Sequence, residues 1–424
     1  LAGNTTGQEN TASGVSALAT NTTGSNNTAF GRDALFANTT ADSNTAVGKS
    51  ALESNTSGTL NSALGVDVLK SNTTGVRNTA VGALALDANT TGDFNSAYGY
   101  ASLGKNTTAD DNTAFGNKSL EDNTTGQYNT AVGSMSLRDS TTSSNNTAVG
   151  YNSLALNTTG TQNTAVGNNS LDASTTSSYN TAVGAYSLGA NTTGATNTAV
   201  GNSALQNNTT AADNVAVGNG ALLTNTTGTQ NTALGTNALD ASTTASFNTA
   251  LGYQALGSTT TGAQNTAVGR SAMIASTTGA NNVAVGMNAL SASTTSDNTI
   301  AIGHSALAAC TTGDSNTAIG RSALGSNTTA SNNVAVGDQA LNQNTTGGNI
   351  TAVGHQAAFA NTTGNNHVAI GYQALKSVTT HGNNIAIGGE AMQSATGSGS
   401  IGIGYRALKN LTDHNNVAIG NNCL

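Results

Sequence analysis

The 424-residue chain contains no proline and no tryptophan, and only 8% of its residues are charged. Soluble globular domains carry about 25% charged residues, so the composition disfavours an ordinary globular fold. Aromatic residues make up only 4% of the chain, a shortage that is typical of disordered segments. Disorder requires no regular spacing of residues, however, and this sequence is strictly periodic.

The charge and hydropathy exclude two classes of partner. The net charge is −8 and the isoelectric point lies near 4.9, which disfavours nucleic acid, because phosphate binding requires a basic surface. No apolar run approaches the roughly 20 residues of a membrane span, so we expect no membrane insertion in this segment. Two cysteines, Cys310 and Cys423, are too few for a scaffold held together by disulfides.

A 17-residue repeat runs through the chain. We name as anchor glycines the residues that end each Asn-Thr-Ala-Val-Gly segment. They begin at Gly14 and recur every 17 residues up to Gly388. Two 16-residue steps follow, to Gly404 and Gly420, which gives 25 copies. Such strict tandem repetition is typical of a solenoid.

The columns of the aligned copies indicate short β-strands separated by turns. In the copy from Asn78 to Phe94, Thr79 and Val81 alternate with small residues, as in a strand. We expect a second short strand around Ala85 and Leu86, before the turn-forming segment N-T-T-G. Common helical repeats need about 33 residues, whereas 17 residues suit one β-coil. The sequence therefore predicts an all-β parallel β-solenoid of about 25 coils.

One solenoid is expected throughout the chain, with no inserted domain. Residues 1–388 hold the regular 17-residue repeats, and residues 389–424 hold two shortened 16-residue repeats that continue them. Asparagine begins the strand in 21 of the 25 copies. Stacking places these side chains above one another, so we expect their amides to form a hydrogen-bonded ladder that fixes the register.

Each copy also carries two small residues, of the Ala80 and Ala85 type. The first of them is alanine in every copy except one, where Gly402 replaces it. A strand face restricted to such residues suggests close approach by another backbone, and we expect a second copy of this chain as the partner. The alternative is that these alanines line a narrow solenoid interior.

Segments such as N-V-A-V-G (Asn214 to Gly218), N-I-A-I-G (Asn384 to Gly388) and H-V-A-I-G (His367 to Gly371) resemble the head repeats of trimeric autotransporter adhesins. The full unit also resembles the repeat shafts of phage tail-fibre and related surface-fibre proteins. The resemblance covers essentially the whole chain. It implies a left-handed β-roll, three identical chains around one axis, and attachment to host-surface or matrix glycans or proteins.

We therefore expect a structural and adhesive segment of an extracellular fibre on a cell or virion surface, with no enzymatic activity and no cofactor. One alternative is an ice-binding solenoid, because the Thr-Thr column stacks into a regular hydroxyl array. Another is a single-chain filament that stacks end to end. Leu1 and Leu424 share one repeat position, and neither end has a polar capping unit. The same feature is expected of a segment cut from a longer protein.

No catalytic or metal-binding arrangement is evident from the spacing of reactive residues. We expect each of the five histidines to be a solvated turn residue: His304, His355, His367, His381 and His414. Five tyrosines occupy variable positions after the anchor glycine: Tyr100, Tyr151, Tyr253, Tyr372 and Tyr405. Aromatic rings on a repetitive surface could stack on sugars, but these five are too scattered to define a site.

Asn-Thr-Thr is also the acceptor motif for N-glycosylation. The candidate acceptors begin at the first repeats: Asn4, Asn21, Asn38, Asn72, Asn89, Asn106, Asn123 and Asn157. The alternative is that Asn and Thr simply form this turn, because the same column also accepts Ser140, Ser174 and Ser242.

Overall fold

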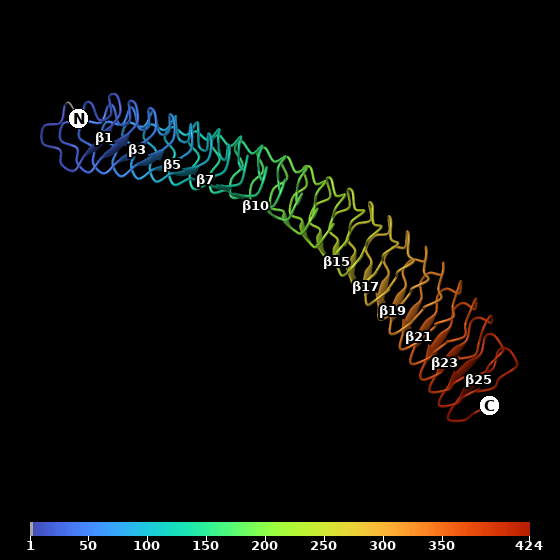
Figure 1. Cartoon of the computed structure of the whole chain (residues 1–424). Helices are drawn as coiled ribbons and strands as arrows, with labels where there is room; N and C mark the ends of the chain where they lie inside the picture. Colours follow the sequence, from blue (N-terminus) through green and yellow to red (C-terminus); the bar gives the residue numbers. More distant parts are fainter. Residues whose placement is uncertain (1–2) are drawn as a thin grey trace. The chain divides into compact units, whose positions relative to one another are not determined.

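The computed structural model describes residues 3–424, and the chain divides into two compact units, Leu1–Asp213 and Asn214–Leu424. Each unit is built from coils with one three-residue strand per coil (Figure 1). Neighbouring strands pair in parallel. The predicted all-β parallel β-solenoid of about 25 coils is confirmed. Among the described residues there is no helix long and apolar enough to cross a membrane.

The first unit contains twelve strands in a parallel stack. In this stack Thr45 pairs with Ser62 and Ser62 with Thr79, each 17 residues further on. The strands are β1 (Thr11–Ser13), β2 (Thr28–Phe30), β3 (Thr45–Val47), β4 (Ser62–Leu64), β5 (Thr79–Val81), β6 (Ser96–Tyr98), β7 (Thr113–Phe115), β8 (Thr130–Val132), β9 (Thr147–Val149), β10 (Thr164–Val166), β11 (Thr181–Val183) and β12 (Thr198–Val200).

The second unit contains thirteen strands in the same arrangement. Near its end Ile385 pairs with Ile401, and Ile401 with Val417, so the two 16-residue repeats stack in the same register as the others. The strands are β13 (Val215–Val217), β14 (Thr232–Leu234), β15 (Thr249–Leu251), β16 (Thr266–Val268), β17 (Val283–Val285), β18 (Ile300–Ile302), β19 (Thr317–Ile319), β20 (Val334–Val336), β21 (Thr351–Val353), β22 (Val368–Ile370), β23 (Ile385–Ile387), β24 (Ile401–Ile403) and β25 (Val417–Ile419).

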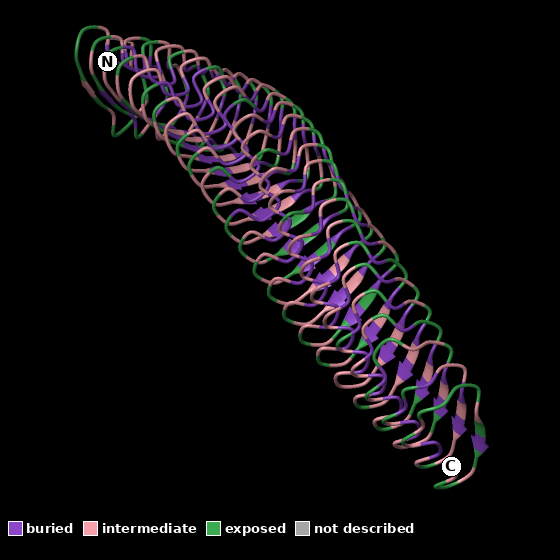
Figure 2. Cartoon of the chain, turned by 90° about the vertical axis from the view of Figure 1, so that its right-hand side faces the viewer, coloured by how far each residue is buried: buried purple, intermediate pink, exposed green. Residues whose placement is uncertain are grey.

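The interior of each coil is filled by small residues and one leucine. In the coil of β5, the side chains of Ala80, Ala85 and Leu86 are completely buried. Thr79 and Val81 point to the opposite side of the strand and are partly exposed. Figure 2 shows the same pattern, with buried strand centres in purple between more exposed neighbours. The alanines therefore line a narrow interior, and the expectation that they face another chain is wrong.

The second strand expected around Ala85 and Leu86 is absent, and a turn replaces it. Successive residues of a strand point to opposite faces, so a strand cannot bury both side chains in one interior. Both side chains are buried here because the backbone adopts left-handed conformations at Leu84 (φ 59°) and Leu86 (φ 51°). This conformation costs roughly 1–2 kcal/mol for a residue with a Cβ. Burying a leucine contributes about 1.5–3 kcal/mol, which offsets much of the cost of the two residues.

Hydrogen bonds join neighbouring coils outside the strands as well. The Leu86 N–H donates to the Ser102 carbonyl at 3.0 Å, and the Thr90 N–H donates to the Thr107 carbonyl at 2.9 Å. The turn itself is closed by the Ala85 N–H, which donates to the Gly82 carbonyl at 3.3 Å. The stacking register is therefore fixed around most of each coil, although only three residues per coil form a strand.

The anchor glycines are required by both backbone conformation and close approach. Gly99 has a φ of 133°, which side chains with a Cβ rarely adopt. A Cβ on Gly99 would lie 2.4 Å from the carbonyl oxygen of Gly116 in the next coil. Gly104 lies in the same coil, has no such φ, and its nearest contact to an added Cβ is 3.3 Å, to the Ala101 carbonyl oxygen.

We expect Gly99→Ala to lower the free energy of unfolding, because backbone strain alone costs about 1–3 kcal/mol and the close contact adds to it. Gly104→Ala is the matched control and should change it by much less. Urea-induced unfolding followed by circular dichroism measures both. Equal losses for the two variants would show that the close contact between anchor glycines does not determine the stacking.

Candidate functional site

The predicted ladder of strand asparagines, those that begin each strand, is present. The Asn78 backbone N–H donates to Oδ1 of Asn61, in the coil before, at 2.9 Å. The Asn78 Nδ2 donates to the Gly92 carbonyl, 14 residues further along the same coil, at 2.8 Å. Both asparagines are completely buried. Each strand asparagine therefore joins two coils and also closes its own coil.

A second ladder is formed by the turn asparagines, those of the N-T-T-G segments. The Asn89 Nδ2 donates to Oδ1 of Asn72 at 2.8 Å and to the Gly92 carbonyl at 3.0 Å. Its own Oδ1 accepts from Nδ2 of Asn106 at 2.8 Å. The sequence analysis did not anticipate this ladder, although the 17-residue recurrence of Asn in N-T-T-G was the signal for it.

The candidate glycosylation sites are turn asparagines, and all of them except Asn4 are buried. Nδ2 of Asn89 uses both hydrogens in hydrogen bonds, so a glycan bond to this atom would break one of them. Asn4 is partly exposed, and its Nδ2 donates to the Gly7 carbonyl at 2.9 Å. The geometry favours the turn-forming interpretation for the candidates that are completely buried: Asn21, Asn38, Asn72, Asn89, Asn106, Asn123 and Asn157.

The turn ladder is interrupted where other residues replace asparagine. At one interruption Ser174 is compensated, because its hydroxyl lies 2.6 Å from the hydroxyl of Ser177. A longer interruption in the second unit has no such compensation. Four successive coils there bury a hydroxyl that has no hydrogen-bond partner: Ser242, Thr259, Ser276 and Ser293. These coils lack the side-chain bonds of the turn ladder, whereas the strand asparagines still join them, as where the Asn265 N–H donates to Oδ1 of Asn248.

His367 is not the solvated turn residue that we expected. It takes the place of a strand asparagine, is 1% exposed, and its Nδ1 accepts the Asn384 backbone N–H at 3.3 Å. Burial lowers the pKa of His367, because the interior disfavours the charged imidazolium, although nearby backbone groups oppose the shift. By contrast, His355 lies at the surface, with Nδ1 3.4 Å from an Asp338 carboxylate oxygen.

The remaining reactive residues form no shared site. Cys310 is a buried free thiol in the column of turn asparagines, and Cys423 is a free, partly exposed thiol. Burial raises the pKa of the Cys310 thiol. Among residues 3–424, no group of three or more His, Cys, Asp or Glu side chains is placed to hold a metal ion.

One ion-pair cluster joins the shortened coils. The Glu390 carboxylate accepts from Nε of Arg406 at 2.8 Å and from Nζ of Lys409 at 2.6 Å. Hydrogen bonds from Arg406 and then Lys409 lower the pKa of Glu390 to about 2. The carboxylate therefore stays ionised at neutral pH and bridges the coils that contain the 16-residue steps.

The outer strand face repeats from coil to coil. We define it as the first and third residues of each strand, on either side of the buried centre. In the first unit the first row is Thr or Ser in every strand, as in Thr79. In the second unit an aliphatic residue takes this position in eight strands: Val215, Val283, Ile300, Val334, Val368, Ile385, Ile401 and Val417.

No protein-family model matches this sequence, and no curated protein is significantly similar to it.

We expect Ser276→Asn to raise the free energy of unfolding by about 1 kcal/mol, because an amide would reach the unpartnered hydroxyls above and below it. Ser276→Ala is the control and should be near neutral, since it removes a hydroxyl that has no partner. Urea unfolding measures both. A destabilising Ser276→Asn would mean that this interruption has no room for a ladder residue.

His367 should make stability depend on pH. Its folded-state pKa lies below the usual 6.5, so the unfolded chain binds the proton more tightly. The stabilisation is fully present above pH 6.5 and is lost as the pH falls below that value. We expect His367→Asn to reduce the decrease in the urea midpoint between pH 8 and pH 5. An unchanged decrease would assign the pH dependence to other groups.

Proposed function

We propose that this chain is a structural and adhesive segment of an extracellular fibre, of the bacterial adhesin or phage tail-fibre type. Support comes from the coils themselves, which repeat without an inserted loop from β1 to β25. Enzymes usually place catalytic residues on loops carried by a rigid scaffold, and these coils have no such loops. Coils with a uniform backbone and variable outward residues suit a spacer that presents a repetitive surface.

The observation that carries the proposal is the aliphatic outer strand face near the end of the second unit. Four successive strands have aliphatic residues in both rows: Val368, Ile370, Ile385, Ile387, Ile401, Ile403, Val417 and Ile419. Ile370 is 38% exposed, and Ile387 is 36% exposed. Contiguous apolar surfaces of this kind mark sites of association.

Copies of the same chain are the proposed occupants of this face. A row of identical, regularly spaced aliphatic side chains can pack against the same row of another copy without any change of register. The resemblance to trimeric adhesin heads suggests three chains and a left-handed β-roll. Its fibre would be exposed at a cell or virion surface, where host glycans or matrix proteins are the proposed targets.

Ice binding is a second candidate, favoured by one observation. Five successive strands, β8–β12, present a row of threonines beside a row of valines on the outer strand face. Bulkier residues interrupt this array in earlier coils, as at Phe30, Tyr98 and Phe115. Aliphatic residues replace much of the threonine row in the second unit. We therefore rank this candidate below the fibre.

We expect light scattering of the purified chain to give three times the chain mass of 41.5 kDa. The double variant Ile370→Glu, Ile387→Glu should shift the mass towards a single chain, because it places charges on the aliphatic outer face. Ser57→Glu, at an exposed turn of the first unit, is the control and should leave the mass unchanged. A single-chain mass for the unaltered protein would contradict the trimer.

A further inference from the structure

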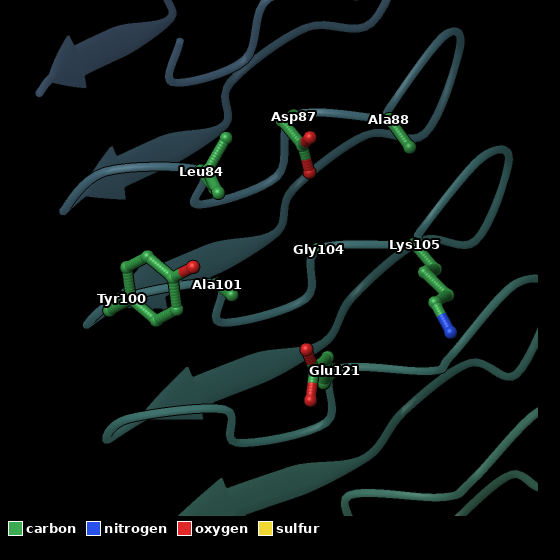
Figure 3. Close-up of a pocket in the computed structure, with 8 residues that line it drawn as sticks. All are labelled: Leu84, Asp87, Ala88, Tyr100, Ala101, Gly104, Lys105 and Glu121. Carbon is green, nitrogen blue, oxygen red and sulfur yellow. The ribbon is translucent and has the colours of Figure 1, made fainter. Parts of the chain in front are cut away.

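A hollow of about 270 Å³ opens between three successive coils of the first unit (Figure 3). Gly104 lies at its centre and contributes no side chain. The carboxylates of Asp87 and Glu121 come from the coils on either side, and the ring of Tyr100 lies at one end. Lys105, which also borders the hollow, is held by Asp122 at 2.7 Å. The hollow thus combines one exposed aromatic ring with two carboxylates.

The glycine creates the space for this arrangement. A Cβ on Gly104 would lie 3.6 Å from Oδ1 of Asp87, so the carboxylate reaches over the position that a side chain would fill. Within residues 3–424, no other side chain donates a hydrogen bond to this carboxylate. Burial is the main cause that raises the pKa of Asp87, opposed by the backbone N–H groups of Asp87 and Ala88. The carboxylate is therefore partly shielded from water and can accept further hydrogen bonds.

An aspartate, a tyrosine and a glycine come together twice more along the chain, without the second carboxylate, because Gln206 and Ile274 stand in the position of Glu121. Asp172 in one coil is followed by Tyr186 and Gly189 in the next, with Tyr186 one repeat position later than Tyr100, and a Cβ on Gly189 would lie 3.5 Å from the carboxylate. In the second unit Asp240 is followed by Tyr253 and Gly257, again at 3.5 Å. Burial raises the pKa of both aspartates too. The three tyrosines are similarly exposed, at 48%, 44% and 48% for Tyr100, Tyr186 and Tyr253.

This recurrence is specific to these coils. In four coils the residue five positions after the anchor glycine is also glycine. Three of these glycines, Gly104, Gly189 and Gly257, have both the aspartate and the tyrosine nearby in the repeat. The fourth, Gly325, has neither. Other exposed tyrosines lack the combination. Tyr151 shares its coil with Ala155 in place of the glycine, and the coil before it carries Arg138 in place of the aspartate.

The geometry points to a neutral saccharide as the ligand of these three Asp–Tyr–Gly subsites. A sugar ring offers an apolar C–H face for the tyrosine and hydroxyl donors for the carboxylate, and the missing glycine side chain leaves room for it. Anionic sugars are excluded by the carboxylates. The two subsites of the first unit are five coils apart, about 24 Å, so one extended glycan can reach both. This assignment rests on the proposed adhesive function and names its ligand class.

Saturation-transfer NMR of the full chain tests the assignment, with linear glucose, galactose, mannose and N-acetylglucosamine oligosaccharides as probes and a sialylated oligosaccharide as the charged comparison. We expect at least one neutral probe to bind and the sialylated one not to bind. The triple variant Tyr100→Ala, Tyr186→Ala, Tyr253→Ala should weaken binding at least tenfold. Tyr151→Ala is the matched control and should leave binding unchanged.

Three results would overturn the assignment: no neutral probe binds, the triple variant binds as well as the unaltered chain, or Tyr151→Ala weakens binding equally. A second triple variant, Gly104→Gln, Gly189→Gln, Gly257→Gln, fills the space while keeping the rings, and should also abolish binding. Circular dichroism shows whether each variant is folded. Light scattering reports on fibre assembly separately, so a trimer that binds no sugar rejects only the saccharide assignment.

Discussion

In each coil with the full motif, one carbonyl oxygen accepts hydrogen bonds from two buried side-chain amides. In the coil of β5 the Gly92 oxygen receives Nδ2 of Asn78 and Nδ2 of Asn89, at 2.8 and 3.0 Å. Asn78 begins the strand and Asn89 begins the turn, so the shared carbonyl ties distant parts of the coil together. Each amide also bonds to the coil before it. A buried polar group left without a partner costs about 1–3 kcal/mol. One inserted residue would break hydrogen bonds in both ladders and would therefore destabilise the stack. This constraint explains the strict repeat length.

The repeat length and residue pattern were enough to predict the parallel solenoid and the strand ladder, because stacking follows directly from periodicity. They were not enough to predict the turn around Leu86. Alternation alone made this segment a strand, whereas burial of both Ala85 and Leu86 required left-handed residues. The turn ladder was missed because Asn in N-T-T-G is equally typical of turns and of glycosylation. The hollow at Gly104 depends on which residues face each other across coils, and single-copy patterns do not reveal that.

The interior and the exterior of the coil have separate roles. Alanine, leucine and the strand asparagine are nearly constant, because a change at these buried positions would alter the packing of the coils above and below. Outward positions have no such restriction, and there the two units differ. The first unit keeps threonine or serine in the first row of the outer strand face, whereas the second unit turns to valine and isoleucine. A fibre segment that binds its own copies through one region and other ligands through another would use such a difference. The proposed Asp–Tyr–Gly subsites would add ligand binding without altering the buried interior of the coil.

The two ladders hold the coils together, and hydrogen exchange of asparagine side-chain amides tests this directly. If the ladders hold the coils, Nδ2 hydrogens of buried residues such as Asn78 and Asn89 will exchange as slowly as the backbone amides of the strands. Exposed residues such as Asn117 and Asn168 provide the fast reference in the same spectrum. Equally fast exchange for the buried and exposed groups would show that the side-chain amides are open to water, which would contradict the account.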